Sequence, residues 1–88
     1  MAEPASLVPR RPYSGAEVIR ALQKWRFVRV SQRGSHVKLK YRHPHTDEVR
    51  TVVVPLHDEL ATGTLQDIAK QAGANDFQRF LDALDDLL

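Results

Sequence analysis

The chain has 88 residues, of which 42% are hydrophobic and 27% are charged, a composition that indicates one globular domain and excludes a long disordered chain. It has no cysteine and no apolar run of about 20 residues, which excludes disulfides, thiol catalysis, cysteine-bound zinc and a bilayer-spanning helix, so we expect a cytoplasmic protein without a membrane partner. The net charge of +2 combines +7 over residues 1–50, with eleven Lys/Arg against four acidic residues, and −5 over residues 51–88, with two against seven, so the first half of the chain is the part suited to a polyanion.

The first thirteen residues contain three prolines and show no apolar periodicity, which is typical of an extended lead-in. We expect residues 1–13 to be flexible and residues 14–88 to form a single domain. Ser14 and Glu17 have the spacing of a capping box, in which each side chain accepts a hydrogen bond from the other residue's backbone N–H. This pair predicts a helix over Gly15–Lys24.

Two extended segments follow this helix. Residues 25–31 are rich in aromatic and β-branched side chains, residues 32–34 (QRG) predict a turn, and residues 35–42 form a second extended run. Apolar and cationic residues alternate in the second run, so one face should be core and the other cationic. The core face comprises Val37, Leu39 and Tyr41, and the cationic face comprises His36, Lys38, Lys40 and Arg42.

A third strand and two more helices complete the domain. Residues 50–54 contain three consecutive valines, which suggests a central or well-covered strand, and Pro55 ends it. After a loop, Thr64 is expected to cap a helix that runs to residue 72, and Asn75 is expected to cap a last helix with an apolar stripe. The order predicts an α+β fold, a three-stranded antiparallel sheet in an α-β-β-β-α arrangement with a short extra C-terminal helix, whose second sheet face is open to solvent.

The cationic strand lies in the most basic part of the chain. From Arg26 to Arg42 there are six lysines and arginines and no acidic residue. This is the charge pattern expected of a phosphate-binding face. A basic surface that only contacts solvent has the same composition, so charge alone does not decide between the two.

His36 is the residue on this face best suited to proton transfer, because histidine both gives and takes a proton near neutral pH. Cleaving RNA without a metal requires removal of the proton from a ribose 2′-OH, attack of that oxygen on the adjacent phosphorus, and protonation of the leaving 5′-oxygen. One positioned histidine accelerates such a step by about 10²- to 10⁴-fold. Arg33, Lys38 and Lys40 would stabilise the added charge on the phosphoryl oxygens. An exposed histidine on a strand is more often an ordinary surface residue, and the residues alone leave that alternative open.

Residues in the turns and loops add weaker signals. Gly34 would let a phosphate approach the backbone, and the Ser35 hydroxyl would hydrogen-bond to it. His57, in the loop after the third strand, is a second acid or base, a residue that positions substrate, or an ordinary loop histidine. His43 and His45 lack further ligands in suitable spacing, so we expect no metal and no other cofactor.

Two blocks of sequence resemble the HicA mRNA interferase family, also called YcfA-like proteins. RGSHVK, at residues 33–38, is similar to the family's signature, and a block from VPLHDEL at residues 54–60 to IAKQAG at residues 68–73 is similar to its third strand, loop and following helix. The resemblance covers roughly residues 14–84. The chain departs from the family in two places: WRF at residues 25–27 replaces the more usual glycine before the first strand, and residues 1–13 are extra.

The resemblance implies a fold like that of the double-stranded-RNA-binding domain and the role of toxin in a type II toxin–antitoxin system. It further implies a metal-independent endoribonuclease that cleaves mRNA and is neutralised by a HicB-type antitoxin covering the active face. His36 corresponds to the family's essential histidine, and His57 to a recurrent histidine of the second block. The expected RNA- or phosphate-binding set is Arg33, Gly34, Ser35, Lys38, Lys40 and Arg42.

Two other functions stay open at the level of sequence. A non-catalytic RNA-binding module of the same fold would bind RNA with a strong salt dependence and leave it intact. A protein-interaction adaptor would use the basic face to bind an acidic partner and would show no preference for RNA.

Overall fold

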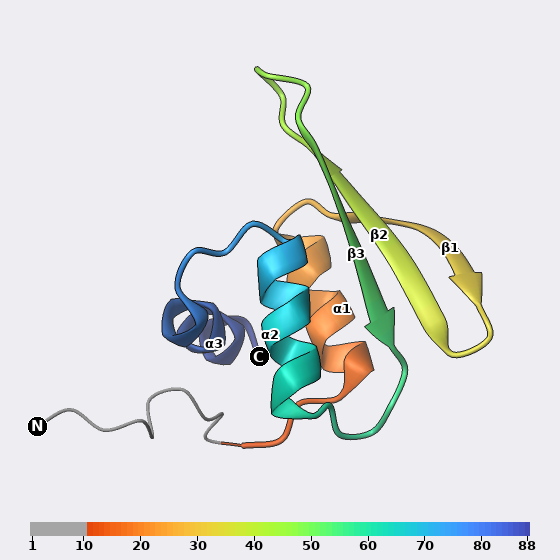
Figure 1. Ribbon diagram of the computed structural model, residues 1–88, viewed down its shortest axis with the longest axis vertical. Coiled ribbons are helices and arrows are strands. Elements are labelled where there is room, and N and C mark those ends of the chain that lie inside the picture. Colours follow the sequence, from red (N-terminus) through yellow and green to blue (C-terminus); the bar gives the residue numbers. More distant parts are fainter. Residues whose placement is uncertain (1–10) are drawn as a thin grey trace, which may run out of the picture.

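A computed structural model describes residues 11–88, which form three helices and a three-stranded antiparallel sheet (Figure 1). The element order is α1 (Gly15–Lys24), β1 (Val28–Arg33), β2 (His36–Arg42), β3 (Val49–Pro55), α2 (Thr62–Gln71) and α3 (Phe77–Leu87). The expected α-β-β-β-α order with an extra C-terminal helix is confirmed, although α3, with eleven residues, is not short. In the part of the chain that is described, no helix has the length and apolarity needed to cross a bilayer.

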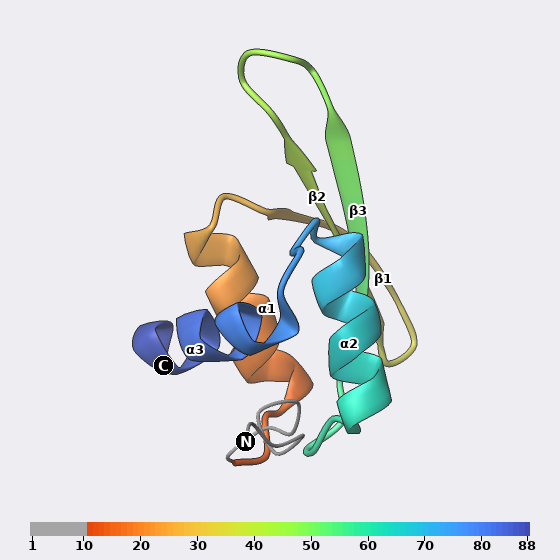
Figure 2. The same cartoon turned by 60° about the vertical axis from the view of Figure 1, so that its left-hand side comes forward.

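The helices cover one face of the sheet. α1 and α2 pack against β3, and α3 packs on α1 and α2, so the helices form two layers on the same side (Figures 1 and 2). Alternate residues of β2 and β3 enter the core, and the side chains of Val37, Leu39, Val52 and Val54 are fully buried there. The residues between them point to the other face, which no helix among residues 11–88 covers. The predicted alternation on β2 is confirmed.

The strand order is β1-β2-β3, so β2 is the central strand and β3 lies at an edge. The valine run predicted a central or well-covered strand at residues 50–54. The central position is wrong, because among residues 11–88 no strand pairs with the outer edge of β3. The alternative, a well-covered strand, is confirmed, since α1 and α2 pack on one face of β3 and bury Val52 and Val54. One backbone donor on that outer edge is paired with a side chain of α2, since the N–H of Val53 donates to Oε1 of Gln71 at 3.0 Å. The strand that begins at His36 is therefore the one paired on both sides.

α1 ends in a Schellman motif whose left-handed residue is not glycine. The N–H of Phe27 donates to the carbonyl of Leu22 at 3.0 Å, and the N–H of Arg26 donates to the carbonyl of Gln23 at 3.1 Å. Arg26 has φ 74°. This reversal uses the residues that composition assigned to the first strand, so β1 begins at Val28, three residues later than predicted.

We expect Arg26→Gly to raise the free energy of unfolding by about 1 kcal/mol. A left-handed φ costs a residue with a Cβ about 1–2 kcal/mol, and the greater freedom of glycine in the unfolded chain offsets part of the gain. α2 closes with the same motif and has Gly73, at φ 89°, in the equivalent place. Urea unfolding measures the change. Arg26→Ala removes the same charge but keeps the Cβ, so an equal gain in both variants would contradict the explanation.

Of the three predicted helix caps, one is confirmed. Ser14 Oγ accepts a hydrogen bond from the N–H of Glu17 at 3.0 Å, and Glu17 Oε1 accepts from the N–H of Ser14 at 3.0 Å. Thr64 does not cap α2, because the helix starts at Thr62, three residues earlier than predicted, and Thr64 lies within its first turn. Asn75 does not cap α3 either, since the neighbouring Asp76 takes that position through its carboxylate.

The expected lead-in falls mostly on residues 1–10, which lie outside the described residues. Its last residue, Tyr13, is fully buried. The Tyr13 hydroxyl donates to the carboxylate of Asp85 in α3, and its carbonyl accepts from the N–H of Leu60 at 2.8 Å. Tyr13 therefore packs against the helices, although it was expected in the lead-in, and the bounds of the domain stay a prediction.

Tyr13 also makes the free energy of unfolding depend on pH in the alkaline range. Burial, together with the hydrogen bond to Asp85, raises the pKa of Tyr13 from 10.0 to about 12. Because the folded pKa is above the unfolded one, Tyr13 contributes its full stabilisation below pH 10.0 and loses it as the pH rises to about 12. We expect Tyr13→Phe to lower the free energy of unfolding by about 1 kcal/mol near neutral pH. Urea unfolding of both proteins at rising pH should show this gap closing, and a constant gap would contradict the assignment.

Candidate nucleic-acid interface

His36 is the first residue of β2 and lies on the open face of the sheet. Across the sheet it pairs with Arg33 of β1 and Pro55 of β3. Residues directly opposite each other on neighbouring strands share a face and have Cβ atoms about 4.5–5.5 Å apart. Arg33 was expected in the turn, but β1 extends to include it. The register therefore places Arg33 and His36 side by side on the same face.

A hollow of about 380 Å³ lies beside His36 on this face. Its lining consists of Ser31, Gln32, Arg33, His36, Lys38 and Val53. Of the predicted site residues, the structure thus brings together Arg33, His36 and Lys38. Sequence reasoning missed Ser31, Gln32 and Val53, of which Ser31 and Val53 lie opposite Lys38. A β-bulge between Arg29 and Ser31 sets this pairing, and no pattern in the sequence signals it.

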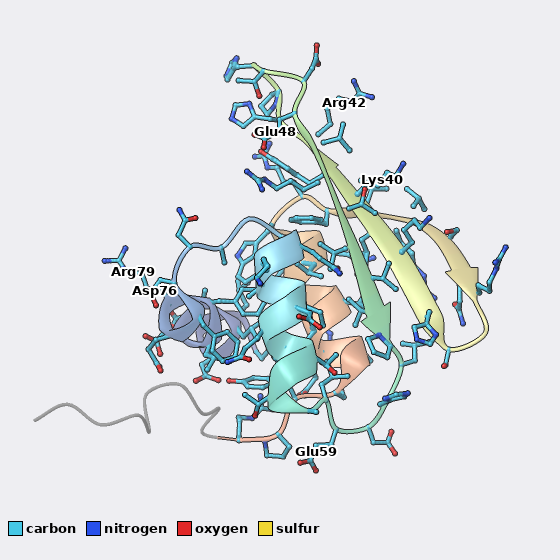
Figure 3. All side chains as sticks on the ribbon, in the orientation of Figure 1. Lys40, Arg42, Glu48, Glu59, Asp76 and Arg79 are labelled. Atoms are coloured by element: carbon cyan, nitrogen blue, oxygen red, sulfur yellow. The ribbon has the colours of Figure 1, made fainter. Side chains whose placement is uncertain are left out.

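Lys40 and Arg42 continue the same face of β2 beyond the hollow. Figure 3 shows both on the side of the sheet away from the helices, with Arg42 nearer the tip of the β2–β3 hairpin. Arg42 lies 3.7 Å from Asp47, and the two side chains are 70% and 83% exposed, so this pair contributes little to stability. Within residues 11–88, neither Lys38 nor Lys40 is in an ion pair. These cations are available to an anionic ligand.

Gly34 and Ser35 form the two-residue loop between β1 and β2. Gly34 has φ 58°, and a positive φ at the first loop position alone is the pattern of a type II′ hairpin turn, which requires glycine there. The carbonyl of Ser35 accepts from the N–H of Leu56 at 2.6 Å, which ties the turn to the loop after β3. Both residues thus have a structural role. Neither lines the hollow, and their contact with phosphate stays a prediction.

His57 lies in the loop between β3 and α2, outside the lining of the hollow. Its carbonyl accepts from the N–H of Gly15 at 2.9 Å, so the loop is held against the start of α1. His57 follows two residues after Pro55, the partner of His36 in the sheet. The backbone near His57 is therefore fixed relative to the site, and a role for its side chain stays a prediction.

His43 and His45 lie near the tip of the β2–β3 hairpin. Nδ1 of His43 accepts from the N–H of His45 at 3.1 Å and from that of Thr46 at 3.3 Å, so this ring nitrogen stabilises the turn. Among the described residues, no three His, Asp or Glu side chains gather closely enough to hold a metal ion. The expectation that no metal or cofactor takes part stays a prediction.

Opposite charges gather at opposite ends of the layered structure. The open face of the sheet carries Arg33, Lys38, Lys40 and Arg42. α3, in the layer farthest from the sheet (Figure 1), carries Asp82, Asp85 and Asp86, with Asp76 at its start. A polyanion is therefore attracted to the sheet and repelled by the outer helix.

A larger hollow, of about 450 Å³, lies on the helical side of the molecule. Its walls include the aromatic rings of Trp25, Phe27 and Phe80, with Asp76 and Arg79 also in the lining. Figure 3 shows the latter two at the start of α3. This hollow contains no histidine and no row of cations, so volume alone does not locate the site.

One family model matches the chain. It is described as "HicA toxin of bacterial toxin-antitoxin" and matches residues 15–74, from the first residue of α1 to the loop after α2. No curated protein matches. The matched region contains all three strands and the open face, whereas α3 lies outside it. The match thus ends earlier than the resemblance seen in the sequence, which extended to residue 84.

Proposed function

This chain belongs to the HicA toxin family of bacterial toxin–antitoxin systems, and on that premise we propose that it is a metal-independent endoribonuclease that cleaves mRNA. His36 is the proposed general acid or base. The observation that carries this proposal is the position of His36 in a hollow beside Arg33 and Lys38, on a face of the sheet that no helix among residues 11–88 covers.

The proposed reaction is an internal transfer of the phosphoryl group. The imidazole of His36 removes the proton of a ribose 2′-OH, the bond between that oxygen and phosphorus forms, and the bond from phosphorus to the 5′-oxygen breaks. The leaving 5′-oxygen takes a proton, either from the imidazolium or from a second acid, for which His57 is the proposed residue. The products are a 2′,3′-cyclic phosphate and a 5′-hydroxyl, so no oxidant or further reactant is needed.

Two cations of the hollow have a proposed role in this step. As the 2′-oxygen attacks, negative charge builds up on the phosphoryl oxygens. Arg33 and Lys38 line the same hollow as His36, which supports their proposed contact with the phosphate at His36. Cations held in place next to the phosphoryl oxygens stabilise the negative charge that develops there in the transition state, which lowers the barrier to the reaction.

The family implies an antitoxin partner. We propose a HicB-type antitoxin that covers the open face of the sheet, because access of RNA to His36 requires that face. Both proteins and the mRNA would then meet in the cytoplasm.

The proposed function is tested by incubating the purified protein with a long RNA in excess EDTA. The matched substrate is the same sequence with 2′-deoxyribose throughout. We expect the RNA to be cut and the deoxy strand to stay intact, because only the RNA carries the attacking hydroxyl. Intact RNA that is nonetheless bound would overturn the enzyme assignment and leave a non-catalytic RNA-binding module. RNA affinity no greater than that of an unrelated protein of equal charge would instead favour a protein-interaction adaptor.

A further inference from the structure

The cations on the open face form a single row along β2. Lys38, Lys40 and Arg42 follow His36 at alternate positions, and two residues of a strand span about 6.6–6.8 Å. Because β2 starts at His36 and the chain reverses through the loop before it, the row extends from His36 in one direction only. It leads toward the hairpin tip, which reaches beyond the helices in both views (Figures 1 and 2).

The residues that the strand register places opposite this row are uncharged, and the nearest acidic group is Asp47 of the hairpin turn, 3.7 Å from Arg42. On β3, Val53, Thr51 and Val49 lie opposite Lys38, Lys40 and Arg42 in turn. On β1, Ser31 lies opposite Lys38, and Val28 lies opposite Lys40. A nucleic-acid duplex presents two phosphate backbones, each of which attracts cations. A single row with neutral borders matches one backbone.

The side of His36 toward the turn between β1 and β2 carries less positive charge than the side toward the hairpin tip. Within residues 11–88, Arg33 is the cation that the register places opposite His36, and the turn follows at once. The loop after β3 carries two acidic residues, Asp58 and Glu59, and Figure 3 shows Glu59 near the start of α2. Phosphates on this side of the scissile bond therefore meet one cation at most among the residues that the register places there.

We propose that β2 is a track for one RNA strand, with the scissile phosphate at His36 and the next three phosphates on one side held in turn by Lys38, Lys40 and Arg42. This proposal rests on the proposed function, since the scissile bond defines its register. Cleavage then depends on the length of the strand on one side of the cut and hardly on the other. The substrate is a single strand held by its backbone.

The test uses DNA strands that contain one ribonucleotide, so that the cut occurs at a known bond while every phosphate is kept. The strand is shortened one nucleotide at a time from either end, and kcat/KM is measured in EDTA for each length. We expect each of the last three phosphates on one side to contribute about two- to fivefold, the range for exposed charge pairs, and shortening on the other side to change little. The same strand paired to a complement should be cut more slowly.

Two variants that each lose one positive charge distinguish specific phosphate contacts along β2 from the general attraction of RNA to a basic protein. Lys40→Gln should abolish the contribution of one phosphate while leaving the effect of the phosphate nearest the cut. Lys70→Gln, at an exposed position of α2, should keep the full length dependence. Thermal unfolding confirms that both variants fold.

Equal losses from shortening at both ends, no dependence on length, or equal cleavage of the duplex would overturn the track and leave the ribonuclease standing. If the all-RNA parent strand is not cut at all, the proposed function fails, and the track fails with it.

Discussion

His36→Ala is expected to reduce RNA cleavage by about 10²- to 10⁴-fold, the contribution of one positioned acid or base. RNA affinity should change little, because Arg33, Lys38, Lys40 and Arg42 keep the charge of the face. Folding should also be preserved, since His36 is exposed. Initial cleavage rates in EDTA, RNA binding by fluorescence anisotropy, and circular dichroism measure the three quantities.

The matched control for this variant is His45→Ala. His45 is also an exposed histidine, but it lies near the hairpin tip, away from the hollow that contains His36. His45→Ala should cleave RNA at a rate within about twofold of the parent's. The substitution lies outside the hollow, and a surface change of this kind has little effect on stability. Equal losses in the two variants, or full activity of His36→Ala, would show that His36 is not the catalytic group.

Gly15→Ala is expected to lower the free energy of unfolding by about 1–3 kcal/mol, the cost of inserting a methyl group into filled space. A Cβ at this position would lie 1.9 Å from the carbonyl oxygen of Pro55 and 3.1 Å from Cα of Leu56. Both are backbone atoms, so no flexible side chain can move aside. The start of α1 must separate from the end of β3, and cleavage should fall as well, because Pro55 pairs with His36.

Gly63→Ala is the control for this prediction. Gly63 lies in the first turn of α2, and a Cβ there meets no atom within 4 Å. Because alanine favours a helix more than glycine does by up to about 1 kcal/mol, this variant should be as stable as the parent or more so. Urea unfolding of both variants decides the matter, and a Gly15→Ala protein of unchanged stability would contradict the close approach.

Local sequence patterns predicted the elements well. The Ser14–Glu17 capping box located the start of α1, and the alternation through Val37 and Leu39 located β2 and its two faces. These features depend on residues that are near each other in the chain, so their chemistry is visible in the sequence. The strand order depends on which element packs where, and the valines of β3 could not distinguish an edge strand covered on one face from a central strand.

An unusual backbone conformation and a long-range contact caused the remaining errors in the fold. Arg26 has a positive φ, which side chains other than glycine rarely adopt, so its place in the helix end was hidden by its residue type. Tyr13 follows three prolines and was grouped with them, although its side chain reaches Asp85, 72 residues away. Contacts over such distances leave no periodic signal.

The site was predicted in part. Alternation on β2 placed Lys38 and Lys40 beside His36 on one face. His36 was chosen among four histidines because alternation placed it on the cationic face, and the resemblance to a family strengthened that choice. Ser31 and Val53 entered the hollow through the strand register and its bulge, which the sequence could not reveal.

The most direct test of the proposed chemistry is the identity of the ends on RNA that the purified protein has cut in excess EDTA. Attack by the 2′-hydroxyl predicts a 2′,3′-cyclic phosphate on one product and a 5′-hydroxyl on the other. RNA that stays intact, or products that carry a 3′-hydroxyl and a 5′-phosphate, would contradict a ribonuclease in which His36 activates the ribose hydroxyl.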